Sequence, residues 1–232
     1  MRMDIFLGVL ANTGLVILGT VIGCIFRSEK VKRVAERVFQ LFALFVILMG
    51  VEGAMGISEP FKALIFMVVG TAIGELIDID KQLNRLGAWV QKKFGGKGGG
   101  FTEGFVQAVL LFCIGSMTFI GALESGIQHV HTTYFTKGGL DCISSITLAA
   151  TYGAGVGLSA LFVLIYQGLL VACAGLLEPV LLPSVVALSA QIGSLSLIGI
   201  GLNMLGITKI KVANFLPAMF LPMIWQAISS LF

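Results

Sequence analysis

Apolar segments long enough to cross a lipid bilayer follow one another along almost the whole chain. Of the 232 residues, 57% are hydrophobic and 12% are charged, whereas a soluble domain has about 45–50% apolar and about 25% charged residues. We therefore predict an all-α, polytopic transmembrane bundle of about eight helices. The expected spans cover residues 5–26, 38–56, 61–79, 105–123, 140–152, 156–177, 184–205 and 212–231.

One apolar stretch, residues 138–175, differs from the others because polar residues and glycines interrupt it. As a single helix it would be too long for an ordinary span. As two spans, its first half would be about 24 Å long against a hydrocarbon core of roughly 30 Å. Short, interrupted helices mark solute or ion sites in membrane transporters. We therefore expect a short or broken helix pair at 140–177, with a hinge formed by Gly153, Gly155 and Gly157.

An acid and several hydroxyl groups lie near the start of this stretch and form the first candidate site. At helical spacing Asp141, Ser144 and Thr147 share one face, with Ser145 beside them. A carboxylate with hydroxyl groups suits a cation, a proton or a polyol-like solute, and an ionisable group at membrane depth needs a partner or a water-filled cavity. Asp141 also has the sequence position of a helix N-cap, where aspartate accepts hydrogen bonds from free backbone N–H groups.

Amide side chains in the predicted spans need hydrogen-bond partners, because lipid offers none. Asn12, Gln167, Gln191 and Asn203 belong to this group. They either connect neighbouring helices or line a cavity. Our candidate solute- or ion-binding site combines the polar face of the 140–152 segment with Gln167 and Asn203.

Basic residues gather in two segments, 27–37 and 80–97, which an even number of predicted spans separates. Because loop lysines and arginines face the cytoplasm, both segments belong on that side, and the N-terminus then lies outside. With eight spans Lys209 and Lys211 are cytoplasmic as well. If residues 140–177 cross only once, the count is seven and these two lysines move outside.

Two glutamates near span ends are candidates for a proton or cation relay. Glu75 lies at the cytoplasmic end of its span, where it could instead pair with Lys81 or Arg85. Glu52 lies near the outer end of its span and could instead extend to the membrane surface. Both alternatives stay open from the sequence.

A glycine-rich segment, residues 95–100, lies near the middle of the chain, and we interpret it as a flexible cytoplasmic linker. It divides one integral membrane domain, residues 1–232, into a three-helix half, 1–94, and a C-terminal half, 101–232. The expected organisation is therefore a single domain built from two parts.

A weak internal similarity links the second and seventh predicted spans. Leu48-Met49-Gly50 and Met55-Gly56-Ile57 resemble Leu197-Ile198-Gly199 and Leu205-Gly206-Ile207. In the eight-span arrangement these spans cross the membrane in opposite directions, as inverted repeats do. Glycine-rich apolar sequences also produce such matches by chance, so both interpretations stay open.

The sequence contains no pattern for catalysis or for a bound cofactor. It has no P-loop, no HExxH and no Ser/His/Asp order, and His129 and His131 lack a third metal ligand nearby. The four cysteines lie in apolar segments and form no CxxC pair. We expect no enzyme activity, no cofactor, no metal site and, with a net charge of only +3, no nucleic-acid partner.

Six short motifs, in order over almost the whole chain, match a known family. They are GTAIGE at 70–75, FCIGSM at 112–117, KGGLD at 137–141, GVGLSA at 155–160, YQG at 166–168 and GLNMLG at 201–206. On these motifs the chain resembles the YdfK/YqgA family of uncharacterised bacterial inner-membrane proteins. The resemblance implies a single multi-span domain in the bacterial cytoplasmic membrane, and it implies no substrate and no functional residue.

The function that these observations favour is a small secondary transporter or exporter of an ion or small polar solute. Its partners would be the lipid bilayer and that solute. One alternative is a channel formed by a homo-oligomer, in which glycine-rich faces supply close contacts between subunits. Another is a membrane scaffold or sensor whose basic loops bind a cytoplasmic partner or anionic lipid.

Overall fold

The computed structural model describes residues 3–26, 32–94, 100–114 and 116–230. Most of the predicted linker at 95–100 and part of the basic segment at 27–37 lie outside these residues. Within the described residues the chain forms helices and connecting segments with no strand, which confirms the predicted all-α fold.

The helices vary in length from single turns to 24 residues. In the described part of the chain the α-helices are α1 Leu7–Ile25, α2 Lys32–Met55, α3 Pro60–Ile77, α4 Ile79–Phe94, α5 Phe101–Cys113, α6 Ser116–Leu123, α7 Thr132–Tyr152, α8 Gly155–Ala172, α9 Ala174–Leu177, α10 Pro183–Met204 and α11 Leu216–Ser229. Three short elements of other helix types complete them: the 3-10 helices η1 Met3–Phe6 and η3 Val212–Phe215, and the π-helix η2 Glu124–Gln128.

Six segments are long and apolar enough to cross a membrane, and they contain α1, α2, α3, α8, α10 and α11. α5 with α6 and η2 would add a seventh as a broken span, since the two parts meet at a bend of 58°. α7 is less apolar, but its 21 residues give a length of about 31 Å, and it packs along α1. The described residues therefore contain six candidate spans, or seven with the broken one. The prediction of about eight passes additionally requires α7 to cross the membrane.

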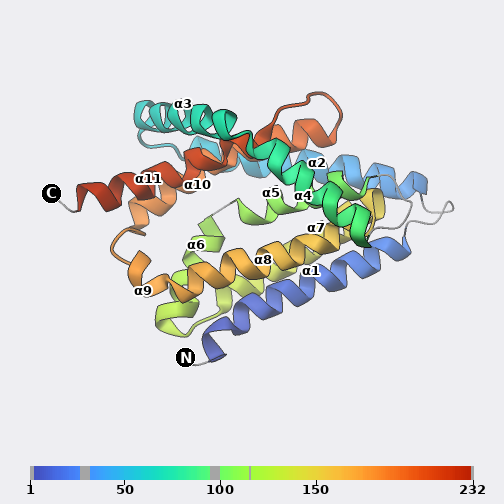
Figure 1. The fold of residues 1–232 in the computed structure, drawn as a ribbon, viewed down its shortest axis with the longest axis horizontal. Helices are drawn as coiled ribbons and strands as arrows, with labels where there is room; N and C mark the ends of the chain where they lie inside the picture. The colour runs from blue at the N-terminus through green and yellow to red at the C-terminus, as the bar shows by residue number, and fades with distance from the viewer. Residues whose placement is uncertain (1–2, 27–31, 95–99, 115, 231–232) are drawn as a thin grey trace.

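Successive helices run back and forth along the long axis of the molecule, so that both termini lie toward one end of the bundle (Figure 1). A contact between Asp4 and His129, with the carboxylate oxygen 3.5 Å from the imidazole Nδ1, places the histidine loop at this N-terminal end. At the other end Phe39, near the start of α2, packs edge-on against Tyr152 at the end of α7.

The start of α2 and the end of α4, which carry described parts of the basic segments, lie toward that second end, which we call the basic end (Figure 1). There Gln91 of α4 accepts a hydrogen bond from Thr102 of α5, and the Lys211 ammonium lies 3.3 Å from the Glu75 carboxylate at the end of α3. The prediction that 27–37, 80–97 and the Lys209–Lys211 turn lie on one side of the membrane stays a prediction, and residues 27–31 and 95–97 lie outside the described part of the chain.

Glycines set the closest helix contacts in the bundle. A side chain at Gly19 of α1 would collide with the Cys142 carbonyl of α7, and one at Gly53 of α2 would collide with Ser194 of α10. Gly70 of α3 is equally close to Ala218 of α11. Small residues allow such backbone approach in lipid, where packing rather than hydrophobic burial holds helices together.

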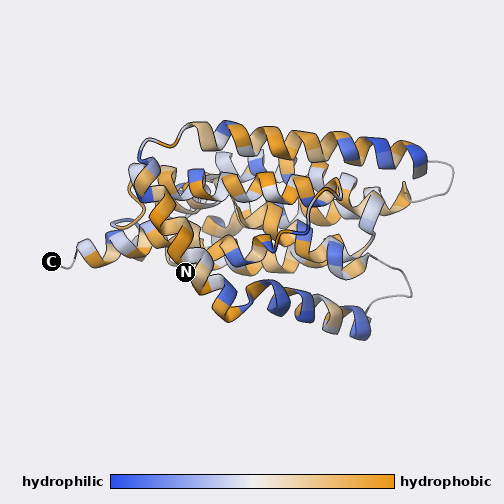
Figure 2. Ribbon diagram, turned by 90° about the horizontal axis from the view of Figure 1, so that it is seen from above, coloured by the Kyte–Doolittle hydropathy of each residue, from blue (hydrophilic) through white to orange (hydrophobic). Residues whose placement is uncertain are grey.

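The outer faces of the bundle are apolar, as a lipid environment requires. Large apolar side chains are exposed along α1, α2 and α3, and Figure 2 shows apolar colour over most of the bundle. The amphipathic helix α4 buries Leu83 and Val90 toward α5 and exposes Trp89. Hydrophilic colour gathers along this helix (Figure 2).

Two expectations about interrupted helices were wrong. The predicted short span 140–152 is the second half of a full-length helix, because α7 begins at Thr132 and continues through Gly138 and Gly139. The predicted span 105–123 is interrupted between the end of α5 at Cys113 and the start of α6 at Ser116, while the predicted break after Tyr152 is present as the turn between α7 and α8.

Candidate functional site

Four polar side chains from three helices meet in the apolar interior of the bundle. Asn12 comes from α1, Lys137 and Asp141 from α7, and Gln167 from α8. Their exposed fractions are 0% for Asn12, 5% for Lys137, 6% for Asp141 and 0% for Gln167. We call these four residues the buried polar cluster. Among the described residues, Lys137 and Asp141 are the charged side chains that are buried.

The two charges of the cluster form an ion pair along one face of α7. The Lys137 Nζ atom lies 2.6 Å from Asp141 Oδ2, and the spacing i to i+4 brings the side chains together on a helix. An ion pair removed from water costs free energy that its mutual attraction often fails to recover. A protein therefore retains such a pair inside a membrane mainly where function requires it.

The two amides of the cluster connect α1 to α8. The Asn12 Nδ2 group donates a hydrogen bond of 3.1 Å to Gln167 Oε1, and the Asn12 amide also lies beside the Asp141 carboxylate. Gly138 makes this possible, since a side chain there would lie 3.2 Å from the Asn12 Cα atom. The close contact of α1 with α7 thus brings a neutral amide pair against the ion pair.

Several buried polar atoms around the cluster have no hydrogen-bond partner within the described protein. They are Asn12 Oδ1, Gln167 Nε2, Ser145 Oγ, Thr118 Oγ1 and the Tyr166 hydroxyl. Buried polar groups are normally paired, so unpaired ones call for an explanation such as a bound ion, solute or water. Ser145 is fully buried and lies one turn beyond Asp141 on α7.

The broken helix ends beside the ion pair. Phe112 and Cys113 are the last residues of α5. The Phe112 ring centroid lies 5.9 Å from Lys137 Nζ. The Cys113 thiol is close enough to interact electrostatically with both Lys137 and Asp141. The Tyr134 hydroxyl of α7 donates a hydrogen bond of 2.9 Å to the Thr118 carbonyl in α6. Interrupted helices next to polar groups are the usual architecture of solute sites in membrane transporters.

The structure brings together only part of the site predicted from the sequence. Asp141 and Gln167 meet in the cluster through Asn12. Asp141 lies ten residues into α7, so the alternative that it is a helix N-cap was wrong. Ser145 and Thr147 are buried on the same helix, whereas the half-buried Ser144 donates its hydroxyl hydrogen bond to the Leu140 carbonyl.

Asn203 does not complete this site. Its amide accepts hydrogen bonds from Thr208 and from the Ile210 backbone N–H and donates one to the Ile210 carbonyl, at 2.7 to 2.9 Å. It therefore holds the turn that follows α10 at the basic end. Gln191, by contrast, acts between helices, because its Nε2 group donates to the Gly56 carbonyl at the end of α2.

The predicted relay and hinge residues lie away from the cluster. Glu75 accepts a 2.6 Å hydrogen bond from Asn214 and pairs with Lys211 at the basic end, rather than with Lys81 or Arg85, and Glu52 is exposed on α2. Hydrogen bonding to Glu75, with the charge of Asp78, raises the pKa of Lys211.

The three predicted hinge glycines lie where α7 meets α8: Gly153 is in the turn, and Gly155 and Gly157 belong to the first turn of α8. Gly153 has φ +85°, and Gly155 lies directly against the Phe101 carbonyl at the start of α5. They therefore shape a connection at the basic end of the bundle instead of exposing carbonyls within it.

Two residues of the buried polar cluster were missing from the predicted site. Lys137 was not considered, and Asn12 was named as a buried amide but not as a ligand. The signal for Lys137 was its spacing of four residues from Asp141. That spacing has meaning only inside a helix, and the sequence analysis placed residues 137–139 before the helix start.

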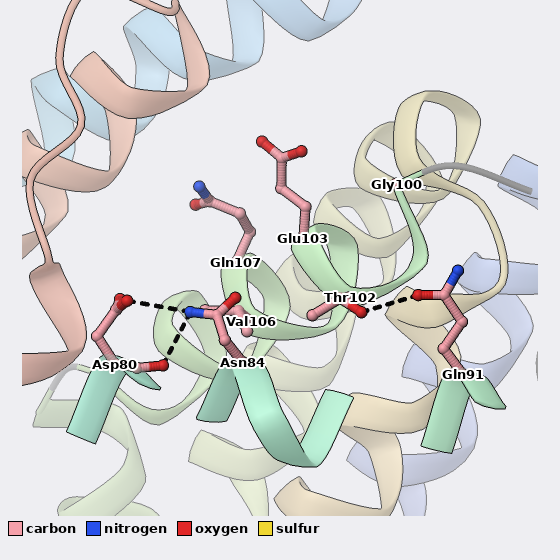
Figure 3. A pocket seen from close by; sticks show the side chains of 8 residues that line it. All are labelled: Asp80, Asn84, Gln91, Gly100, Thr102, Glu103, Val106 and Gln107. Atoms are coloured by element: carbon pink, nitrogen blue, oxygen red, sulfur yellow. Dashed lines mark hydrogen bonds between the residues drawn. The ribbon is translucent and has the colours of Figure 1, made fainter. Parts of the chain in front are cut away.

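A second polar region, an open cleft of about 420 Å³, lies between α4 and α5 toward the basic end (Figure 3). Its lining includes Asp80, Asn84, Glu103 and Gln107. Asn84 Nδ2 donates a 3.0 Å hydrogen bond to Asp80 Oδ2, as the dashed line in Figure 3 shows. Burial raises the pKa of Asp80 above its usual range, while the Lys211 ammonium acts in the opposite direction.

These features define a polytopic helical membrane protein with a charged polar cluster in its interior. The chain belongs to the family described as protein of unknown function, DUF554, which it matches over residues 7–227. This confirms the resemblance drawn from the sequence motifs.

Two relatives span nearly the same length as this chain. It is 28% identical over 219 residues to "Uncharacterized membrane protein YdfK" of Bacillus subtilis (strain 168), covering 93% of each chain. It is 26% identical over 222 residues to "Uncharacterized protein YqgA" of Escherichia coli (strain K12), covering 94% of each. No solved structure matches the chain.

Proposed function

We propose that this protein is a secondary transporter of an ion or small polar solute, and that the buried polar cluster is its binding site. The observation that carries the proposal is the Lys137–Asp141 pair, which is buried among membrane-crossing helices and lies beside a broken one. If the ion pair only held the helices together, apolar side chains at these two positions would do so at a lower cost in free energy. Unpartnered polar atoms next to the pair supply ligands for a solute.

The way the helices pair supports this proposal, because it suggests how the binding site would open to each side of the membrane. α1 packs antiparallel to α8, α2 to α10 and α3 to α11: Thr20 faces Gly157, Gly50 faces Ile198, and Gly74 faces Asn214. Two inverted three-helix repeats, α1–α3 and α8, α10 and α11, would produce this pattern. In such transporters one repeat moves against the other around a site at their interface, where Asn12 and Gln167 meet.

We also propose which membrane contains the protein and which end of the bundle faces the cytoplasm. A helical bundle with relatives in bacteria fits the bacterial cytoplasmic membrane, and the gathering of basic residues at one end places that end in the cytoplasm. The N-terminus then lies outside. The homo-oligomeric channel would use the exposed apolar faces of α2 and α3, but it gives the buried ion pair no role, and neither does a scaffold.

A ligand screen on the purified protein tests the proposal. Thermal unfolding in detergent would be followed with inorganic cations, halides, amino acids, polyamines and carboxylates, for the native protein and for Asp141→Asn. A ligand at a hundred times its dissociation constant should stabilise the native protein by about 2.7 kcal/mol. If the protein is a transporter, at least one compound should stabilise the native protein and should not stabilise Asp141→Asn. The same compound should cross proteoliposome membranes with saturable kinetics.

The control is Gly168→Ala, which adds a methyl group next to Gln167 where no atom lies within 4 Å. It should keep the response of the native protein. If no compound stabilises either folded protein, or if flux does not saturate, the transporter reading fails and a scaffold or a channel replaces it.

A further inference from the structure

The surroundings of the Lys137 ammonium are those that recognise a cation. The Asp141 carboxylate lies 2.6 Å away and the face of the Phe112 ring 5.9 Å away, and aromatic faces attract cations. The C-terminal end of α5, where Phe112 and Cys113 lie, adds partial negative charge from free carbonyl groups. The lysine therefore occupies a position that a free cation could occupy in its place.

Oxygen atoms next to Asp141 are available to a second cation. Asn12 Oδ1 and Ser145 Oγ are unpartnered and belong to side chains with 0% exposure. Ser145 lies one turn from Asp141 on the same helix, and the Asn12 amide lies beside the carboxylate. Carboxylate, amide and hydroxyl oxygens are the ligands that hard cations prefer.

Charge balance decides what must happen when a cation enters. The Lys137–Asp141 pair is neutral as a whole, and an additional unpaired charge in the low-dielectric interior would be expensive. One positive charge must therefore leave the cluster for each one that enters. Lysine can release a proton when its environment disfavours its charge, whereas arginine cannot.

We infer that the protein exchanges a monovalent cation for a proton at the Asp141 carboxylate, with Lys137 as the proton carrier. This inference rests on the proposed transport function and names its substrate class. The cation binds the Asp141 carboxylate, the Lys137 ammonium leaves that carboxylate and gives up one proton, and neutral lysine remains. When the cation leaves on the other side, a proton returns to Lys137 and the ion pair forms again.

The other titratable groups of this core are less suited than Lys137 to the exchange. They are Asp141 and Tyr134 on α7, Cys113 on α5 and Tyr166 on α8, while Asn12 and Thr13 on α1 do not titrate. A proton released from a phenol or a thiol would leave an anion beside the bound cation and the intact ion pair, so that the interior would hold four charges. Release of the proton from lysine leaves only two, those of the cation and of the Asp141 carboxylate.

Proteoliposomes that enclose a pH indicator test the inference with the full-length protein. External Na⁺, Li⁺, K⁺ or Rb⁺ gluconate would be added in turn, with choline gluconate as the blank. The native protein should raise the internal pH with at least one alkali cation, and Gly168→Ala should match it. Asp141→Asn and Lys137→Arg should each reduce the rate at least tenfold.

Lys137→Ala separates the proton carrier from the cation ligand. This variant should keep the cation-dependent thermal stabilisation of the detergent-purified protein and should take up the cation without a pH change, at a rate that follows an imposed membrane voltage. A variant that fails to give a monodisperse protein is replaced by Lys137→Met, which retains an unbranched apolar stem and carries the same expectation.

Three results would overturn the inference in distinguishable ways. Saturable transport of another solute without any cation-driven pH change leaves the transporter proposal standing and removes proton exchange. An anion that stabilises the native protein but not Lys137→Ala makes lysine the ligand and reverses the charge of the substrate. The absence of binding and flux for every solute removes both the inference and the proposed function.

Discussion

At the scale of single residues, the interior of this bundle combines two kinds of polar contact. Lys137 and Asp141 neutralise each other within one helix, whereas Asn12 and Gln167 join two helices. Glycine at position 138 leaves the space that Asn12 occupies. Because each group depends on its neighbours for hydrogen bonds, changes at these positions should be strongly non-additive.

The amide pair allows a direct test of that coupling. Asn12→Leu and Gln167→Leu should each destabilise the protein by about 1–2 kcal/mol, because each leaves the other amide buried without a partner. The double variant should lose less than the sum of the two. Unfolding in mixed detergent micelles measures this cycle, and simple additivity would contradict a direct contact between the two amides.

Asp80 provides a pH-dependent prediction outside the membrane-crossing helices. Burial raises the pKa of Asp80 in the folded protein. The contribution of Asp80 to stability is therefore most favourable below its pKa in the unfolded protein, and it is lost as the pH rises through the raised pKa of the folded protein. Asp80→Asn should therefore stabilise the protein at neutral pH by up to about 0.5 kcal/mol, a range typical of partly exposed positions.

The measurement is the melting temperature of both proteins between pH 4 and pH 8. The difference should shrink toward acid pH, where the native carboxyl is protonated. A difference that is constant with pH would show that lost hydrogen bonding to Asn84, rather than charge, dominates.

At the scale of elements, the parallel packing of α1 on α7 builds the candidate site. Gly8 faces Tyr134, Gly19 faces Ser145 and Gly23 faces Ala149, so the two helices remain in contact along their lengths. The buried polar cluster lies between the first two of these contacts. Widening the gap between the helices should therefore weaken the site as well as the fold.

A matched pair of alanine substitutions tests this contact. Gly19→Ala should destabilise the protein by about 1–3 kcal/mol, because the added methyl group collides with the Cys142 carbonyl. Gly14→Ala adds the same group where no atom lies within 4 Å, and it should be neutral or stabilising by up to about 1 kcal/mol. Equal melting temperatures for the two variants would rule out the close approach of α1 to α7.

The sequence predicted most helices because their apolar runs have span length and end at polar turns. It did not predict the start of α7, since Lys137, Gly138 and Gly139 resemble a loop, and the contact of Gly138 with α1 is visible only in the folded structure. It also missed the break after Cys113, because the predicted span 105–123 contains no proline and no charged residue that would mark an interruption. Asp141 and Gln167 could be singled out by their polarity alone, but their connection through Asn12 depends on tertiary packing.

At the scale of the whole molecule, the two ends of the bundle differ in charge. The basic end holds the starts of α2 and α5 and the turn at 208–211, while the N-terminal end holds Asp4 and His129. Both termini lie toward one end of the bundle (Figure 1). The proposed topology, with an even number of passes and the basic end in the cytoplasm, would account for this arrangement.

Single cysteines in a variant lacking the four native ones would test this topology. An impermeable thiol reagent added to intact cells should label Asp4→Cys and Ser229→Cys and should label Lys209→Cys only after lysis. Labelling of position 209 alone would reverse the orientation and keep the count. Labelling of positions 4 and 229 from different sides would contradict an even number of passes.

The most direct test of the central claim is water access to the buried polar cluster. Ser145 is fully buried next to Asp141, so Ser145→Cys in the variant lacking native cysteines would react with an impermeable thiol reagent only when the site opens. In proteoliposomes we predict reaction both from the outside and, with trapped reagent, from the inside, each slowed by the transported solute. No reaction from either side in folded protein would show a permanently closed core and would contradict a transport role.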